Sequence, residues 1–107
     1  MNDARGDNGP DASAPKADAI VRVMRIVNEK GLHARASAKF VQTVEKFDAD
    51  VRVSRGGETV GGTSIMGLMS LAAARGTDIT VEATGADAQA AIDAIEALVA
   101  GRFGEDE

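Results

Sequence analysis

Apolar and polar residues alternate along the chain in runs that predict short strands and amphipathic helices. Residues Ala19–Val27 are rich in apolar residues and predict a strand, and Asn28–Gly31 has the chemistry of a turn. Apolar residues then recur at helical spacing and predict an amphipathic helix: Phe40, Val41, Val44 and Phe47. A hairpin should follow, because Asp50–Arg55 alternates valine with polar residues, Gly56-Gly57 is a turn signal and Glu58–Val60 supplies a short return strand.

The second half of the chain predicts a short helix, a strand and a longer helix. Ile65–Leu71 fits the short helix, and the strand that follows presents apolar residues on one face, namely Ile79, Val81 and Ala83. Ala86–Ala100 has a helical pattern that should turn its branched residues inward: Ile92, Ile95 and Val99. The run Thr84–Asp87 just before it resembles a capping box.

The predicted element order is strand, helix, strand, strand, helix, strand, helix (βαββαβα). Strands with one apolar face need a cover, and three amphipathic helices supply it, so we expect an α+β protein built as a two-layer sandwich. The first strand is the least regular part of the pattern, because Arg22 and Arg25 lie on opposite faces of it.

With 107 residues, the chain has room for a single hydrophobic core. Residues 1–18 lack apolar periodicity and predict a disordered tail, residues 19–102 predict the folded domain, and residues 103–107 an acidic C-terminal end. Without cysteine and with one histidine, the chain offers neither a disulfide nor a thiolate or histidine-rich metal site. Its glycine pairs lack the lysine and spacing of a nucleotide-binding loop, so no cofactor is expected.

The overall charge limits the class of partner. A net charge of −5 and an isoelectric point near 4.8 argue against nucleic acid as the main partner, because such binding depends on neutralising phosphates. No apolar run reaches the roughly 20 residues that span a bilayer, and the N-terminus lacks the apolar core of a signal peptide. We therefore expect a soluble, cytoplasmic protein without membrane insertion.

The histidine, His33, lies where the first loop gives way to the first helix. The first backbone N–H groups of a helix have no intrahelical partner, so with the helix dipole they form an anion site. A phosphoryl group on the imidazole would lie against those donors, with Arg35 near enough to add a charge-assisted hydrogen bond. The same position disfavours imidazolium and keeps the ring neutral and nucleophilic. On position alone, a histidine at a helix start is more often a capping or surface residue, so the flanking residues decide between the two interpretations.

Those flanking residues resemble the active-site motif of the HPr family, the small histidine-containing phosphocarriers of the bacterial phosphoenolpyruvate-dependent phosphotransferase system. The run Gly31–Arg35 matches the family's Gly-Leu-His-x-Arg motif, and Gly62–Leu71 is similar to the segment around the family's regulatory serine, here Ser64. Both motifs have the family's order and spacing, and the resemblance covers about residues 19–100. It implies an HPr-like open-faced sandwich, with a four-stranded antiparallel sheet covered on one face by three helices.

The resemblance also implies a phosphoryl-group carrier rather than an enzyme. Enzyme I would phosphorylate His33 on Nδ1, Arg35 would stabilise the phosphate, and the group would pass to a histidine of a IIA-type domain. An HPr kinase/phosphorylase is a further candidate partner, acting on Ser64, and the carrier is expected to be a monomer. The alternative is a regulatory binding module of an incomplete or nitrogen-related phosphotransferase system, which controls kinases or transcription regulators without sugar transport.

Partner contacts are expected on both motifs, at Ala34, Ala36, Lys39, Ile65, Met66, Leu68 and Met69. Of these, Ile65, Met66, Leu68 and Met69 cannot all face inward on one short helix, so they form either an exposed patch suited to several partners or the edge of the core. Arg35, Lys39 and Lys46 fall on similar helical phases. This basic face is either ordinary solvated surface or a surface that steers an acidic partner towards His33.

Ser64 and Ala36 each have a second interpretation. A serine before a short apolar helix is most often an N-cap, a role compatible with phosphorylation of Ser64. Ala36 stands where the family often has proline, which would preset the first helical turn. Alanine favours the helix without that constraint and adds an N–H, so we expect it to affect the rate of transfer rather than the identity of the site.

Overall fold

Regular elements follow one another in the order that the apolar pattern predicts. They are β1 (Ile20–Arg25), α1 (Ala34–Val44), β2 (Asp50–Arg55), β3 (Glu58–Gly61), α2 (Ile65–Ser70), β4 (Asp78–Thr84) and α3 (Ala88–Ala100), followed by the 3-10 turn η1 (Arg102–Gly104). The structure, a computed structural model, describes residues 18–106. The expected disordered tail therefore lies outside the described residues, apart from Asp18.

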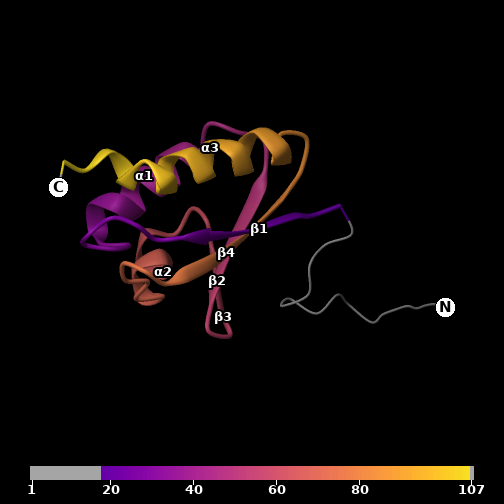
Figure 1. The fold of residues 1–107 in the computed structure, drawn as a ribbon. Helices are drawn as coiled ribbons and strands as arrows, with labels where there is room; N and C mark the ends of the chain where they lie inside the picture. Colours follow the sequence, from indigo (N-terminus) through magenta and orange to yellow (C-terminus); the bar gives the residue numbers. More distant parts are fainter. Residues whose placement is uncertain (1–17, 107) are drawn as a thin grey trace.

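The strands form one antiparallel sheet in the order β1-β4-β2-β3 (Figure 1). Strand β4 lies between β1 and β2, so that Ala83 faces both Ile20 on one side and Val51 on the other. The hairpin of β2 and β3 turns through Gly56 and Gly57, whose φ angles of 58° and 85° suit glycine in a two-residue turn.

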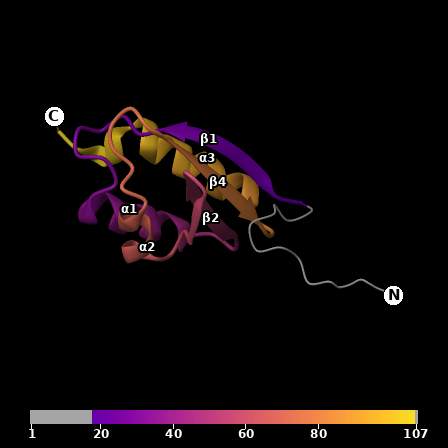
Figure 2. The same cartoon turned by 90° about the horizontal axis from the view of Figure 1, so that it is seen from below.

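The core lies between the sheet and the helices. Figure 2 shows α3 running along β1 and β4, against which it packs. The residues predicted to face inward on β4 and α3 are all buried, as are three of the four predicted on α1, with Phe47 partly buried. The two-layer α+β sandwich with a four-stranded antiparallel sheet and three helices is thus confirmed. Within residues 18–106, no helix combines the length and the apolar character that a membrane span requires.

Strand β1 carries arginines on both faces because it is an edge strand. Arg22 lies towards the helices but reaches past the sheet edge to α3, where its guanidinium donates to Asp93 at 2.9 Å and Glu96 at 2.8 Å. Arg25 points to the other face and pairs with Asp78, its cross-strand neighbour, at 3.0 Å. Charged partners at the edge therefore replace the apolar alternation that a central strand would need.

The predicted capping box is wrong. Thr84 is the last residue of β4, and the N-cap of α3 is Asp87, which makes no side-chain bond to the helix. Its carboxylate instead accepts a hydrogen bond of 2.8 Å from the backbone N–H of Asp48. The helix consequently begins at Ala88 rather than at the predicted Ala86.

The packed domain also extends beyond the expected boundary at Arg102. Phe103 is completely buried in the core, so residues 103–106 are not merely an acidic end. The chain passes through left-handed backbone at three consecutive residues, Arg102, Phe103 and Gly104, with φ of 60°, 56° and 73°. We call these three residues the C-terminal hook.

Candidate functional site

His33 is the N-cap of α1, as its position in the sequence predicts. Its backbone is extended, and its carbonyl accepts the first helical hydrogen bond, from Ser37 at 2.9 Å. The imidazole makes no capping bond to the helix, so it leaves the first-turn N–H groups available to another acceptor. Its side chain is 28% exposed, which leaves the ring accessible but held on one side.

The loop that carries His33 is fixed from both ends. The Asn28 side chain is fully buried and donates a 2.8 Å hydrogen bond to the carbonyl of Gly31. The N–H of Leu32 donates to the carbonyl of Ala73 at 3.0 Å. Gly31 has a φ of 67°, and a Cβ there would lie 2.4 Å from the same carbonyl oxygen, so the close approach requires glycine.

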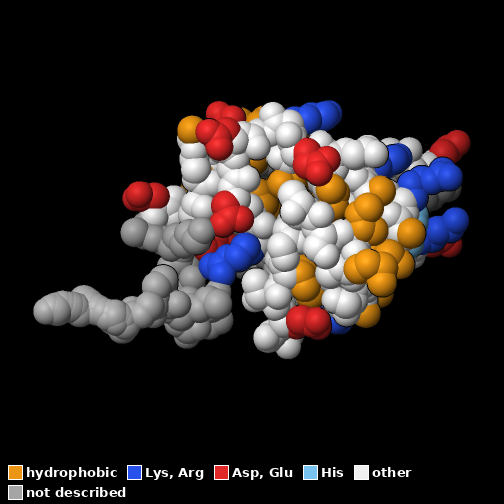
Figure 3. Space-filling view, turned by 180° about the vertical axis from the view of Figure 1, so that it is seen from behind, with side chains coloured by type: hydrophobic (Ala, Val, Ile, Leu, Met, Phe, Trp, Pro, Cys, Tyr) orange, Lys and Arg blue, Asp and Glu red, His pale blue; other side chains and the backbone are white. Residues whose placement is uncertain are grey.

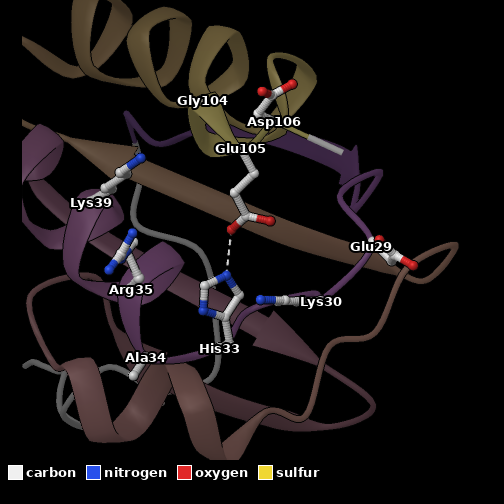
Figure 4. A pocket seen from close by; sticks show the side chains of 9 residues that line it. All are labelled: Glu29, Lys30, His33, Ala34, Arg35, Lys39, Gly104, Glu105 and Asp106. Atoms are coloured by element: carbon white, nitrogen blue, oxygen red, sulfur yellow. Dashed lines mark hydrogen bonds and ion pairs between the residues drawn. The ribbon is translucent and has the colours of Figure 1, made fainter.

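Glu105 contacts the histidine ring, a relationship that the sequence interpretation missed. Its Oε2 hydrogen-bonds Nε2 of His33, and its Oε1 accepts a 3.1 Å bond from the Asn28 amide (Figure 4). Burial alone would raise the pKa of this carboxyl. The bonds to His33 and Asn28, together with the nearby positive charge of Lys30, outweigh burial and hold the pKa below its usual value. The carboxylate form is therefore the stable one in this position.

The C-terminal hook brings Glu105 to the ring. Phe103 anchors the hook in the core, and its carbonyl accepts a 2.6 Å hydrogen bond from the Lys39 ammonium. Lys39, expected as a partner contact, is thus half-buried and ties α1 to the hook. A lone aromatic residue followed by glycine, Phe103-Gly104, is the available sequence signal for such an anchored turn.

Arg35 is the basic side chain best placed for an anion at this site. It is exposed in the first turn of α1 and, among residues 18–106, forms neither a hydrogen bond nor an ion pair. Helix α1 ends at Val44, so Lys46 lies in the following turn and does not extend the predicted basic helical face.

A cavity of about 710 Å³ opens over the ring (Figure 4). Its lining is mostly charged and consists of Glu29, Lys30, His33, Ala34, Arg35, Lys39, Gly104, Glu105 and Asp106. The ring nitrogen not bonded to Glu105, Nδ1, lies on the side of Ala34 and Arg35 (Figure 4). Within the described part of the chain, no group of three or more potential ligand side chains is placed to hold a metal ion.

The second motif contributes a serine cap and an apolar surface. Ser64 is exposed and is the N-cap of α2, as predicted, with its Oγ accepting from the N–H of Gly67 at 2.9 Å. Three apolar residues of α2 are exposed, Ile65 and Met69 by 39% and Met66 by 77%, and we call them the α2 patch. Met69 and His33 line the same shallow depression, which joins the α2 patch to the histidine. Figure 3 shows hydrophobic side chains gathered beside the histidine, with Lys and Arg at the rim.

Ala36 and Leu68, predicted as partner contacts, present no side-chain surface to a partner. Both side chains are completely buried. Ala36 faces the core from the first turn of α1, and Leu68 is the residue by which α2 is anchored to the core. Both interpretations of the apolar residues on α2 therefore apply, because one of these residues lies in the core and three lie on the surface.

The sequence is similar to that of known phosphocarrier proteins. The family model described as "PTS HPr component phosphorylation site" matches residues 20–101. Phosphocarrier protein HPr of Cupriavidus necator is 52% identical over 88 residues, which are 82% of this chain and 99% of the relative. Phosphocarrier protein NPr of Shewanella violacea is 40% identical over 86 residues, which are 80% of this chain and 94% of the relative.

The fold has close counterparts among solved structures. HPr-C-His from Thermoanaerobacter tengcongensis superimposes with a TM-score of 0.78 at 39% identity, over 82% of this chain and 99% of that one. An HPr dimer from the same organism superimposes with a TM-score of 0.65 at 41% identity, over 77% of this chain and 94% of that one.

Proposed function

The chain belongs to the HPr family of phosphocarrier proteins of the phosphotransferase system, and from this premise we propose that His33 accepts a phosphoryl group from phosphorylated Enzyme I and passes it to a histidine of a IIA-type domain. The observation that carries the proposal is the orientation of the ring. His33 caps α1, its Nε2 is engaged by Glu105, and Nδ1 lies on the side of the helix start and Arg35. Nδ1 is therefore the nitrogen that takes the phosphoryl group.

The chemistry requires one nucleophile and a stabilised anion. The Nδ1 lone pair attacks phosphorus in the donor phosphohistidine, the donor N–P bond breaks, and its electron pair returns to the donor nitrogen. Negative charge on the transferring oxygens is stabilised by the Arg35 guanidinium and by the free N–H groups of the first turn of α1. The cavity over the ring leaves room for the phosphoryl group and for the side chain of a donor or acceptor histidine.

The α2 patch is the proposed docking surface for Enzyme I and the IIA-type domain. It is apolar, it adjoins His33, and its two methionines can adapt to more than one partner. The cavity lining holds both basic and acidic side chains, and its exposed Arg35, which forms no ion pair within residues 18–106, favours an acidic group on the partner. We propose that the carrier acts as a monomer, which light scattering at working concentration tests.

Ser64 is the proposed regulatory phosphorylation site, modified by an HPr kinase/phosphorylase. Its side chain is exposed directly before the α2 patch, so a kinase can reach it without unfolding the domain. A phosphate there adds up to about two negative charges at the rim of the docking surface. The modification should therefore weaken docking of an acidic Enzyme I.

A regulatory binding module without sugar transport is the second candidate. It is favoured by the exposed Ser64 beside the docking surface, and the likeness to the relative named NPr fits a family with more than one kind of carrier. Such a module would use the same surface to control a kinase or a transcription regulator. The two candidates differ in whether phosphate on His33 moves on to a sugar-transport IIA domain.

The deciding experiment incubates the chain with Enzyme I and phosphoenolpyruvate and measures acid-labile phosphate on His33. His33→Ala should keep the fold, because the ring makes no capping bond, although it loses the bond to Glu105 and some stability with it, and it should take up no label. Undiminished acid-labile label on His33→Ala would refute the site. Addition of a sugar-transport IIA domain then separates the two candidates, since only a transport carrier discharges its label to it.

A further inference from the structure

We propose that Glu105 is a positioning residue for phosphoryl transfer, holding the proton of His33 on Nε2 and thereby reserving Nδ1 for the phosphoryl group. This inference rests on the proposed function and adds to it a residue far from both sequence motifs. Glu105 lies 72 residues from His33 along the chain, yet its carboxylate contacts the ring directly. In a neutral imidazole, the nitrogen that hydrogen-bonds to an acceptor group is the one that carries the proton.

The hydrogen bonds around Glu105 leave one arrangement of donors and acceptors. The Asn28 amide nitrogen donates both to the carbonyl of Gly31 and to Oε1 of Glu105, at 2.8 and 3.1 Å. An ionised carboxylate only accepts, so the group facing Oε2 must be a donor, and that group is Nε2 of His33. The lowered pKa of Glu105 keeps the carboxylate ionised and so preserves this pattern.

With the proton on Nε2, transfer needs no proton movement. The Nδ1 pair forms the new N–P bond, the donor N–P bond breaks, and the donor imidazole recovers its electron pair. The His33 ring keeps its Nε2–H and gains positive charge as Nδ1 shares its pair with phosphorus. The carboxylate on Nε2 stabilises that developing charge, so its interaction is stronger in the transition state than in the resting carrier.

The position of the carboxylate is built into the fold. Left-handed backbone is unfavourable for Arg102 and Phe103, and it is held here because the Phe103 ring is buried and its carbonyl is bonded by Lys39. Lys39 belongs to α1, the helix that His33 caps. The ring and the carboxylate are therefore fixed to the same helix, one through its N-cap and the other through the hook.

The test combines kinetics with the nitrogen spectrum of the imidazole. Glu105→Ala removes the acceptor, Glu105→Gln keeps an oxygen acceptor without charge, and Asp106→Asn removes the same unit charge from a carboxylate that points away from the ring (Figure 4). Initial rates of His33 labelling by Enzyme I are measured over a range of carrier concentrations. In parallel, NMR of the unphosphorylated carrier, with ¹⁵N in the His33 ring, reports which ring nitrogen is protonated and whether its proton is protected from exchange with water.

Glu105→Ala should lower the kcat of Enzyme I with the carrier as substrate on the order of tenfold, which corresponds to the loss of one charge-assisted hydrogen bond. The KM for the carrier should change little. The variant should also lose the protected Nε2–H resonance. Glu105→Gln should fall between parent and Glu105→Ala, because its amide can satisfy either His33 or Asn28 but not both. Asp106→Asn should keep the parent's nitrogen spectrum.

An unchanged Nε2–H resonance in Glu105→Ala overturns the inference, whatever the rate. A change confined to KM also overturns it, because that result assigns Glu105 to docking. If the parent itself takes no label from Enzyme I, the proposed function fails, and with it the transfer role of Glu105, even where the spectrum shows the Nε2 proton held. If the parent is labelled and Glu105→Ala is labelled at the same kcat, only the present inference fails.

Discussion

The Oγ of Ser64 accepts a hydrogen bond of 2.9 Å from the N–H of Gly67, so the hydroxyl proposed for phosphorylation also caps α2. Modification would therefore change the charge of a group that already holds the local backbone. A phosphate has acceptor oxygens that can bond the same N–H, so α2 should stay folded after modification. The expected effect of the modification is on docking rather than on folding.

Ser64→Asp should slow His33 labelling by Enzyme I while leaving the fold intact. Aspartate keeps a capping oxygen and adds negative charge beside the α2 patch, although less than phosphate does. Ser64→Ala, the uncharged control, should label at the parental rate but lose about 1 kcal/mol of stability with the cap. Initial rates at low and high salt check this, and equal rates for all three proteins at low salt would leave Ser64 as a helix cap alone.

Arg35→Ala should slow phosphoryl transfer far more than it lowers stability. The guanidinium is exposed on the side of the ring where Nδ1 lies and is proposed to stabilise charge on the transferring group. Loss of one such donor commonly costs on the order of 10²-fold in rate. Lys46→Ala is the matched control, since it removes a positive charge beyond the end of α1. Single-turnover labelling and thermal unfolding measure the two effects, and parental rates in Arg35→Ala would show that the helix start alone suffices.

Two neighbouring substitutions on α2 should separate docking from folding. Met66 is 77% exposed and Leu68 is completely buried. Met66→Ala should change the free energy of unfolding by less than about 0.5 kcal/mol, yet it should raise the KM of Enzyme I for the carrier. Leu68→Ala should cost about 2–5 kcal/mol of unfolding free energy, because it leaves a cavity under α2. Chemical denaturation with steady-state kinetics tests the pair, and an unchanged KM in Met66→Ala would remove the α2 patch from the docking surface.

The contribution of Glu105 to stability should depend on pH. Burial would raise the pKa of its carboxyl, but the bonds to His33 and Asn28 hold the pKa below the ordinary value of 4.5. The folded state therefore binds fewer protons than the unfolded state just below that value. The stabilisation is complete above the unfolded pKa and is lost as pH falls through the folded one.

The difference in Tm between the parent and Glu105→Gln should accordingly be largest above about pH 5 and shrink below about pH 4. Asp106→Asn serves as the control for general charge effects at the same end of the chain. A difference that grows on acidification would contradict the assigned direction of the pKa shift.

Local pattern was sufficient to predict most of the fold. Alternation placed Ile79, Val81 and Ala83 on one face of β4, and helical spacing placed Phe40 and Val44 in the core, because these signals report burial directly. The capping box before α3 failed because the Asp87 carboxylate is used by the backbone of Asp48, a contact between distant residues. Such a competing acceptor role leaves no trace in the local sequence.

The candidate site was predictable only in part for the same reason. His33, Arg35 and Ser64 lie in short motifs at element boundaries, where position along the chain defines their surroundings. Glu105 reaches His33 only because Arg102 and Phe103 adopt a backbone that their own conformational preferences disfavour. The burial of Ala36 and Leu68 likewise depends on which side of each helix meets the core.

The hydrogen bond from Leu32 to Ala73, with the close approach at Gly31, joins the histidine loop to the segment that follows α2. His33 and the α2 patch are therefore connected through hydrogen-bonded backbone, and their spacing belongs to the fold itself. A partner that recognises this spacing loses little conformational entropy on the carrier's side when it binds. Weak, rapidly reversible complexes can then still be specific, as the proposed transfer from Enzyme I to a IIA-type domain requires.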